Sequence, residues 1–225
     1  MTRVIKIAID GPAAAGKSTI AKMTAEKLGY TYIDTGAMYR ALAHKAISHS
    51  IDTSNGEELH SLLMETEIVL SPSKAGQAVI VDGVDVTKEI RSQQVTAQVS
   101  AVAVHSGVRE LMVEKQRQLA EGTGVVMDGR DIGTAVLPNA ELKIFMTASV
   151  EERALRRHIE NIQHGITTSL DELKAEISER DRADSEREVS PLCQAQDAVL
   201  IDTTSMSIEE VANQISELAE KRIRL

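Results

Sequence analysis

The stretch IAIDGPAAAGKST, residues 7–19, decides the fold class of this 225-residue chain. A short apolar run at residues 4–9 leads into it, and such a run is typical of a strand buried on both faces of a parallel sheet. The pattern G-x-x-x-x-G-K-S follows at residues 11–18, and apolar residues continue at helical spacing over 18–28. A strand before that pattern and a helix after it are the setting of a phosphate-binding P-loop.

The residue types of this loop suit a nucleoside triphosphate. Small residues let backbone N–H groups converge on an anion, and the helix N-terminus adds positive potential. We expect Lys17 to reach the outer phosphates, the Ser18 hydroxyl to bind Mg²⁺ and Thr19 to lie near the α-phosphate. A glycine turn with an exposed lysine is the alternative, and it leaves the strand-to-helix setting unexplained. The predicted ATP-binding residues are Gly11, Pro12, Ala13, Ala14, Ala15, Gly16, Lys17, Ser18 and Thr19.

Strands and helices alternate along most of the chain. Further strands are predicted at residues 30–33, 125–127, 142–146 and 198–201, with a helix at 36–47. SVEE (149–152) and SIEE (207–210) each have the spacing of a capping box, in which a serine and a glutamate close a helix start. The alternation predicts an α/β fold whose core is a five-stranded parallel sheet flanked by helices.

Two stretches interrupt this rhythm. Residues 66–90 alternate apolar and polar positions between turn residues, which predicts a small antiparallel insertion, followed by one helix over about 92–119. Residues 151–190 are densely charged with both signs, which is typical of a solvated helical hairpin. We therefore expect an insertion and a hairpin added to the parallel core.

Composition narrows the classes of partner. The net charge of −9 and an aromatic content of 2% argue against a nucleic-acid-binding surface, which needs basic residues and rings for stacking. Cys193 is the single cysteine, so no intrachain disulfide can form, and we expect an inert, partly buried thiol in a reducing compartment. No signal-peptide pattern and no apolar run of roughly 20 residues is present in the sequence. These features predict a cytoplasmic protein without nucleic-acid or membrane partners.

Polar segments follow two of the predicted strands, where ligands bind in open parallel sheets. DTGAMYR covers residues 34–40, and DGRDIGT covers residues 128–134. In the second segment, Asp128 is a candidate for contact with Mg²⁺ or its waters, Arg130 for a phosphate, and Asp131 for hydrogen bonds from a base. A turn with a local ion pair is the alternative, but the joint position of these charges favours a binding site.

The charged hairpin carries arginines at helical spacing. Arg180, Asp184 and Arg187 share one helical face, and a surface salt bridge between the first two is the simpler interpretation. Another such face carries Arg153, Arg156 and Arg157. Arginine suits a polyphosphate because its planar fork binds phosphate oxygens in pairs and keeps its charge. The two faces together predict a hairpin that closes over phosphates.

The combination of these segments resembles the bacterial-type cytidylate kinases, which are nucleoside monophosphate kinases. The matching segments lie between residue 5 and about residue 192: IAIDGPAAAGKST, DTGAMYRAL, QVTAQVSAVA, VREL, VVMDGRDIGT and ISERDRADSER. The resemblance implies a P-loop core at residues 1–36, 103–150 and 189–225. It also implies an acceptor-binding segment at 37–102, which includes the antiparallel insertion, and a mobile lid at 151–188.

The resemblance also implies roles for individual residues. Thr35 matches a residue near the acceptor ribose and phosphate, and Arg40 and Arg130 match the arginines that hold this phosphate. The residues matching those that read the cytosine edge are Ser100, Arg109 and Asp131. Those near the acceptor sugar are Arg180, Asp184 and Arg187. Those expected at the transferring phosphoryl group are Arg156, Arg157 and Arg182, and the implied catalytic set is Lys17, Arg130, Arg156, Arg157, Arg182 and Arg187.

The activity that the resemblance implies is phosphoryl transfer from ATP to CMP, and to dCMP, with Mg²⁺. The attacking phosphate oxygen is already ionised at neutral pH, so positioning and charge neutralisation suffice and no general base is needed. A monomer is the usual form in this family. One alternative is a kinase for another monophosphate, such as UMP or AMP. Another is a nucleotide-binding switch that transfers nothing, in which the acceptor arginines would have no purpose.

Overall fold

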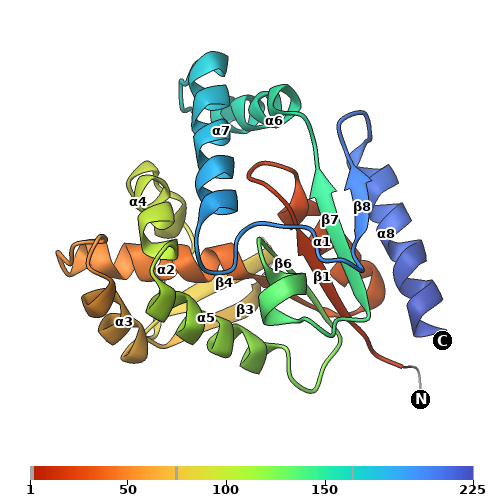
Figure 1. Ribbon diagram of the computed structural model, residues 1–225, viewed down its shortest axis with the longest axis horizontal. Helices are drawn as coiled ribbons and strands as arrows, with labels where there is room; N and C mark the ends of the chain where they lie inside the picture. Colours follow the sequence, from red (N-terminus) through yellow and green to blue (C-terminus); the bar gives the residue numbers. More distant parts are fainter. Residues whose placement is uncertain (1–2, 74–75, 164, 225) are drawn as a thin grey trace. The chain divides into compact units, whose positions relative to one another are not determined.

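The computed structural model describes residues 3–73, 76–163 and 165–224 (Figure 1). The chain divides into two compact units. The first consists of Met1–Thr31 and Thr123–Leu225, and the second of Tyr32–Gly122.

A five-stranded sheet has the order β2-β6-β1-β7-β8, with β1 in its centre (Figure 1). Its strands are β1 (Lys6–Asp10), β2 (Thr31–Asp34), β6 (Val125–Gly129), β7 (Leu142–Thr147) and β8 (Val199–Asp202). β1 pairs parallel with β6 and β7, and β7 pairs parallel with β8. All five residues of β6 are buried, as expected for a strand covered on both faces. The predicted parallel sheet is confirmed.

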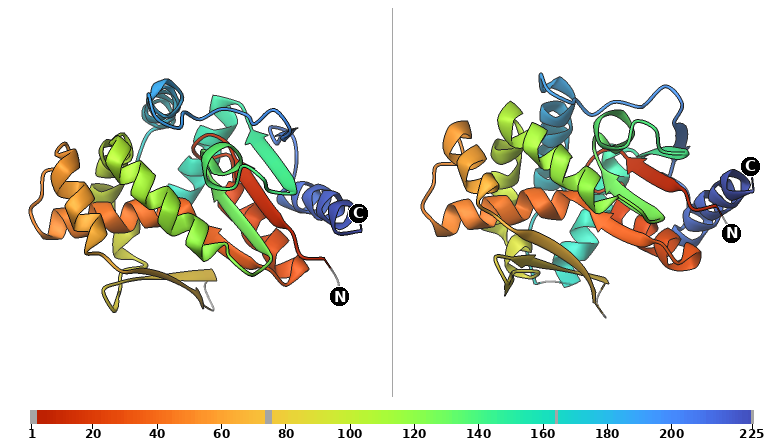
Figure 2. Two further views of the ribbon diagram at one scale, coloured as in Figure 1. Left: turned by 60° about the horizontal axis from the view of Figure 1, so that its bottom comes forward. Right: turned by 90° about the horizontal axis from the view of Figure 1, so that it is seen from below.

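The first unit contains long helices and one short helical turn (Figures 1 and 2). α1 (Lys17–Leu28) packs against α8 (Ile208–Ile223) and against β6. α6 (Val150–Gln163) and α7 (Leu170–Glu186) pack on each other as the predicted helical hairpin. A single π-helical turn, η2 (Ile132–Val136), follows β6.

The helix starts only partly follow the predicted capping boxes. Ser207 and Glu210 form a complete box at the start of α8. Before α6 the box is incomplete, so that prediction is wrong in part. The Ser149 hydroxyl still accepts from the Glu152 N–H at 3.1 Å. The Ser149 N–H, however, donates to Thr204 Oγ1, and the Glu152 carboxylate accepts from Arg156 instead.

The second unit combines helices with a small antiparallel sheet (Figure 2). Its helices are α2 (Thr35–Ser48), α3 (Gly56–Met64), η1 (Glu89–Arg91), α4 (Gln93–Ala103) and α5 (Ser106–Leu119). Its sheet is β3 (Ile68–Ser73), β4 (Gly76–Val81) and β5 (Val84–Asp85), paired antiparallel in that order as the alternation predicts. The helices bury a core that includes Met38, Leu42, Leu59, Val99 and Met112.

The single helix predicted over 92–119 is wrong, because the chain forms two helices there. α4 ends at Ala103, and α5 begins at Ser106 after His105, whose backbone is extended (φ −73°, ψ 121°). The Nε2 atom of His105 lies 3.0 Å from the carbonyl oxygen of Thr53. This tertiary contact holds the corner, and the local sequence pattern does not contain it.

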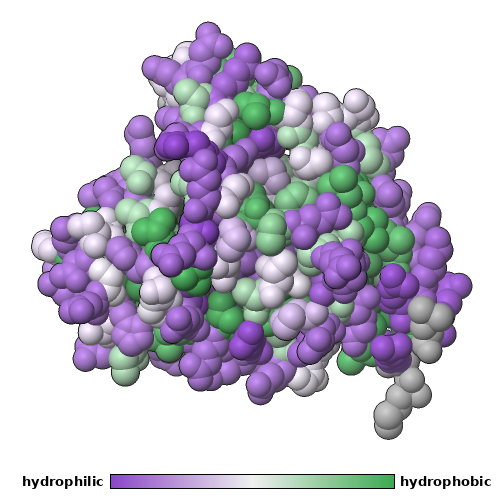
Figure 3. Space-filling model, viewed as in Figure 1, coloured by the Kyte–Doolittle hydropathy of each residue, from purple (hydrophilic) through white to green (hydrophobic). Residues whose placement is uncertain are grey.

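The surface bears on two predictions. The thiol of Cys193 is exposed, which corrects the expectation of partial burial. Hydrophilic residues cover most of the face shown in Figure 3. Across the described ranges, every helix is too short or too polar to cross a membrane.

Candidate active site

The phosphate loop leaves β1 in a conformation that requires glycine. Gly11 has φ +149°, and a Cβ built on it would lie 2.0 Å from the carbonyl oxygen of Met146 on β7. Ala14 (φ 57°) and Gly16 (φ 83°) also have positive φ values, and Gly16 is the N-cap residue of α1. The loop therefore turns sharply from the central strand into the helix N-terminus, where backbone N–H groups can bind an anion.

Replacing Gly11 with alanine should destabilise the protein by about 3 kcal/mol, because the overlap is with backbone of a central strand that cannot move aside. Thermal unfolding measures this loss. Gly29→Ala is the matched control, since Gly29 has φ +65° but nothing within 4 Å of its built Cβ. That control should cost about 1 kcal/mol, from backbone strain alone. Equal losses in the two variants would contradict the close approach at Gly11.

The side chain of Lys17 lies within the phosphate loop. Its ammonium Nζ donates to the Pro12 carbonyl oxygen at 2.7 Å, and the residue is 6% exposed. Burial lowers the pKa of Lys17 to about 7, and the positive charge of Arg130 lowers it further. The carboxylates of Asp128 and Asp10 raise this pKa but do not outweigh burial. An anionic ligand beside this amine would compensate its charge.

Ser18 and Asp128 bring two oxygen donors together at the first turn of α1. The Ser18 hydroxyl donates to Asp128 Oδ2 at 2.9 Å, and Asp128 is 4% exposed at the carboxyl end of β6. Mg²⁺ prefers oxygen ligands and commonly uses one or two protein groups together with waters and substrate phosphates. The pair therefore fits a magnesium ion that is bound mainly through the nucleotide. The part of the chain described here contains no cluster of three acidic, histidine or cysteine residues for a protein-only metal site.

The helical hairpin contacts the phosphate loop through Arg153 and Asp181. The sequence pattern placed Arg153 on the arginine face of the hairpin but gave it no individual role, and it did not indicate Asp181. Arg153 is 4% exposed and donates to the carbonyl oxygens of Ala148 (2.9 Å) and Ala13 (3.1 Å). It also forms an ion pair with Asp181, whose Oδ1 accepts from the Ala13 N–H at 3.3 Å. The feature that identifies Arg153 is its burial with backbone and carboxylate partners, and this burial depends on the tertiary fold.

The three hairpin arginines predicted at the phosphoryl group differ in their surroundings. A Cβ built on Gly16 would lie 3.8 Å from Arg156 Nη1, which places this guanidinium beside the start of α1. Arg157 pairs with Glu160 on its own helix at 3.0 Å. Arg182 is 61% exposed in its side chain and pairs with Glu179 and Glu186, also on its own helix. Arg156 therefore lies beside the loop while pairing with Glu152 on its own helix, whereas Arg157 and Arg182 pair with carboxylates away from the loop.

A chain of alternating charges joins the end of β6 to α7. Arg130 Nε donates to Asp184 Oδ2 at 2.8 Å, and Arg187 lies 3.5 Å from Asp184 Oδ1 and 3.8 Å from Asp131 Oδ1. Burial alone would raise the pKa of Asp184, but the guanidinium groups of Arg130, Arg180 and Arg187 outweigh it and hold that pKa below its usual range. Five predicted substrate-binding residues thus interact in the first unit.

The other predicted substrate residues belong to the second unit. Thr35 is 3% exposed at the start of α2, and Ser100 is half-buried on α4. Arg40 Nη1 donates to Thr96 Oγ1 at 2.8 Å and to the Ile90 carbonyl oxygen at 3.3 Å. Arg109 is 2% exposed, donates to the Ala103 carbonyl oxygen at 3.2 Å and lies over the Tyr39 ring. The break after α4 frees the carbonyl oxygen that Arg109 uses.

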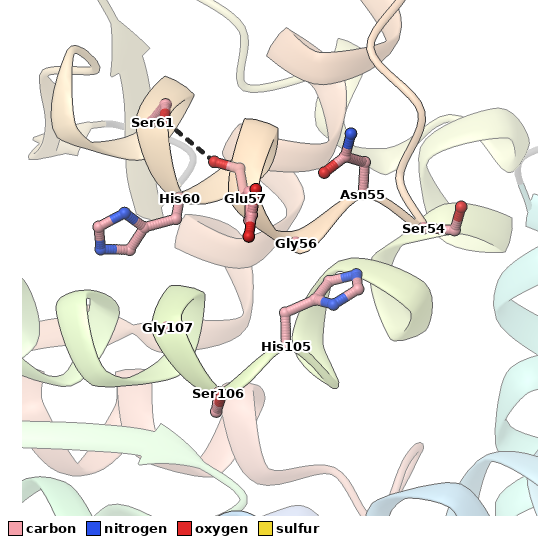
Figure 4. A pocket seen from close by; sticks show the side chains of 9 residues that line it. All are labelled: Ser54, Asn55, Gly56, Glu57, His60, Ser61, His105, Ser106 and Gly107. Atoms are coloured by element: carbon pink, nitrogen blue, oxygen red, sulfur yellow. Dashed lines mark hydrogen bonds between the residues drawn. The ribbon is translucent and has the colours of Figure 1, made fainter.

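A pocket of about 810 Å³ in the second unit lies apart from these residues (Figure 4). It lies at the N-terminal ends of α3 and α5, where Figure 4 shows His60 and His105 on facing elements. None of the predicted site residues lines it.

Comparison with known proteins gives a consistent assignment. A family model described as cytidylate kinase matches residues 7–221. Cytidylate kinase from Geobacillus kaustophilus (strain HTA426) is 61% identical over 99% of this chain and 100% of its own length. Cytidylate kinase from Bacillus subtilis (strain 168) is 57% identical over the full length of both chains.

A solved structure supports the fold alone. An uncharacterized protein from Eubacterium ventriosum is 12% identical, with a TM-score of 0.52 over 96% of this chain and 98% of its own. The family is shown by the sequence match, which extends over nearly the whole chain at high identity. The chain belongs to the cytidylate kinase family.

Proposed function

We propose that this chain transfers the γ-phosphoryl group of ATP to the phosphate of CMP, giving ADP and CDP, and that it accepts dCMP as well. The observation that carries the proposal is the presence of two sets of groups in one compact unit. A phosphate loop with a buried lysine ends β1, and the charged chain of Arg130, Asp184, Arg187 and Asp131 begins at the end of the neighbouring β6. The relatives at 57–61% identity carry the name of this activity.

The donor side needs groups that hold and neutralise a triphosphate. The loop N–H groups and Lys17 would bind the phosphates, and Ser18 with Asp128 would hold Mg²⁺ directly or through its waters. Bound there, Mg²⁺ would neutralise charge on the phosphates during transfer. Arg156 lies beside the start of α1, and all three of Arg156, Arg157 and Arg182 would reach the phosphoryl group by leaving their present carboxylate partners.

The acceptor side needs cations that exchange partners. Arg130 and Arg187 are paired with Asp184, and a bound acceptor would offer both guanidinium groups alternative partners, with a phosphate dianion able to bind Arg130 through two oxygens. We assign Arg40, Arg130 and Thr35 to the acceptor phosphate and ribose, and Arg180, Asp184 and Arg187 to the sugar. No step requires a general base, because the acceptor oxygen is already ionised at neutral pH.

Base selection follows from donor and acceptor pattern. Cytosine offers the N4 amino donor and the N3 and O2 acceptors, which a carboxylate and an arginine complement. We assign this role to Asp131 and Arg109, with Ser100 as an additional hydroxyl. Uracil carries an oxygen where cytosine carries the N4 amino group, so the Asp131 carboxylate would face another acceptor. Unpaired buried groups of this kind strongly reduce the use of the wrong substrate.

A panel of acceptors tests the function. ADP formation with Mg-ATP is measured with CMP, dCMP, UMP, AMP, GMP and no acceptor. Strong turnover confined to CMP and dCMP is expected. Preferential use of UMP or AMP would move the specificity to another monophosphate. ATP binding without acceptor-dependent ADP would support the nucleotide-binding switch instead.

Asp131→Ala should narrow the ratio of kcat/KM for CMP to that for UMP by about tenfold or more, since it removes the group that prefers an amino donor. The same panel measures the ratio. Asp197→Asn is the control, because Asp197 is an exposed carboxylate that pairs with Lys143 on the same unit. An unchanged ratio in Asp131→Ala would remove Asp131 from base reading.

We further propose that the chain acts in the cytoplasm as a monomer, without nucleic-acid or membrane partners. The negative net charge and the exposed single cysteine support this setting.

A further inference from the structure

Asp10 occupies a position that neither the phosphate loop nor the acceptor residues explain. It is the last residue of β1, directly before Gly11, and it is 4% exposed. Its Oδ1 accepts from the Ile132 N–H at 2.7 Å, and its Oδ2 accepts from the Gly133 N–H at 2.7 Å. One carboxylate therefore holds two successive backbone N–H groups of the turn that follows β6, with both oxygens used.

The turn held in this way is the one that presents Asp131. The Asp131 carbonyl oxygen accepts from the N–H groups of Ala135 (2.8 Å) and Val136 (3.2 Å), which closes the π-helical turn. The two N–H groups after Asp131 are fixed by Asp10. The peptide units that follow Asp131 are thus fixed from two sides. Because Asp10 pairs with Gly129 in the sheet register, this support comes directly from the strand that ends in the phosphate loop.

A carboxylate is the side chain that this position requires. An asparagine presents one acceptor and one N–H₂ group, so one backbone N–H would face a donor. An apolar side chain would leave both N–H groups unpaired in a buried place. Space is also limited, since a Cβ built on Gly133 would lie 3.3 Å from Asp10 Oδ2.

Ionisation of this carboxylate is costly in the folded chain. Burial raises the pKa of the Asp10 carboxyl from 3.8 to about 6, in spite of the two backbone N–H groups and Lys17, which favour ionisation. At a pH between these two pKa values, the Asp10 carboxyl is ionised in the unfolded chain but still protonated in the folded chain. Above pH 6 the ionised group therefore reduces stability relative to an ordinary aspartate. The two backbone N–H groups of the turn nevertheless hold this carboxylate in place, and they tie the acceptor turn to Asp10.

We infer that Asp10 is a positioning residue that fixes the acceptor turn to the phosphate-loop strand, so that Asp131 and Arg130 are held in the geometry needed to select cytosine. This inference rests on the proposed function. In this role Asp10 acts through the peptide units at Ile132 and Gly133. Losing it should damage CMP recognition more than ATP binding.

Asp10→Asn tests the inference in the full chain. We expect KM for CMP to rise and the CMP-to-UMP ratio of kcat/KM to fall, each by about tenfold to a hundredfold, because small misplacements of recognition groups have effects of this size. KM for ATP should change by less than about threefold. The ratio is informative because CMP and UMP carry the same phosphate, so an effect on phosphate binding alone cancels.

Two further variants keep the test decisive. Ile215→Val shortens a fully buried side chain on α8, so it should lower the unfolding temperature while leaving the ratio unchanged. Gly133→Ala adds a Cβ that lies 3.2 Å from Lys143 Cδ and 3.3 Å from Asp10 Oδ2, so it crowds the contact between Asp10 and the turn, and it should also lower the ratio if Asp10→Asn does not fold.

The outcomes distinguish failure of the inference about Asp10 from failure of the proposed function. A normal CMP-to-UMP ratio in a folded Asp10→Asn chain, or in Gly133→Ala where the first variant is unfolded, would overturn the inference and leave Asp10 as a structural residue. An equal rise in KM for ATP and CMP would overturn it as well. Absence of CMP turnover in the unchanged chain would overturn the proposed function itself, and the inference with it.

Discussion

Replacing Lys17 with methionine should lower turnover with ATP and CMP by about a thousandfold, the size of effect seen when a charge-stabilising donor is removed from a transferring group. Methionine fills much of the space of the lysine stem, so the loop should still form. What is lost is the ammonium that donates to Pro12 within the loop and would move onto phosphate oxygens.

The physical reason lies in where Lys17 is buried. In water a lone lysine would contribute little, but here the ammonium is 6% exposed, and charge interactions are strong in such surroundings. A thousandfold loss corresponds to about 4 kcal/mol of transition-state stabilisation. ADP release at saturating ATP and CMP measures it, and KM for ATP shows how much of the loss is binding.

Lys27→Met is the matched control on the same helix. Lys27 is exposed in the last turn of α1 and donates to Asn213. Its replacement should leave turnover within about twofold, since an exposed interaction of this kind contributes little. Comparable losses in both variants would show that charge on α1 in general, rather than Lys17 at the phosphates, matters for the reaction.

The sequence predicted those parts of the protein whose signals are local. The P-loop pattern, the apolar strands and the Ser207–Glu210 cap each depend on residues within a few positions of one another, and the parallel sheet followed from their alternation. The start of α3 also carries such a signal in Asn55, which caps the N–H of Glu58, although the prediction missed it.

The remaining features depend on contacts between distant segments. The helix break at His105 is accompanied by a contact between its Nε2 atom and the carbonyl oxygen of Thr53, 52 positions away. Asp10 reaches Ile132, 122 positions away, and nothing beside it in the chain predicts this partner. Arg153 was expected on an arginine face that closes over phosphates, but its partners Ala13 and Ala148 and its burial are set by the fold. Periodicity can place a side chain on a face of its element, but the partner on that face comes only from the fold.

The arginines of α7 also share a helix but have different partners, and the variant Arg187→Ala should show that Arg187 matters for turnover. We expect turnover with CMP to fall by about a hundredfold, because this guanidinium is 5% exposed in its side chain and lies between Asp131 and Asp184. Its Nε also donates to the Ser190 carbonyl oxygen at 2.6 Å, which fixes its orientation. Removing it takes away a cation that we assign to the acceptor side, and it leaves the carboxylates of Asp131 and Asp184 less compensated.

Lys174→Ala on the same helix is the control, because Lys174 forms only a surface pair with Asp171 at 3.8 Å. It should change turnover by less than about twofold. Arg187→Lys distinguishes charge from geometry. Since a lysine keeps the charge but lacks the planar fork, it should recover only part of the lost turnover. If Arg187→Ala and Lys174→Ala reduced turnover equally, the assignment of Arg187 to the acceptor would be wrong. Helix α7 would then act through its overall charge, and not through the ion pairs that link Arg187 to Asp131 and Asp184.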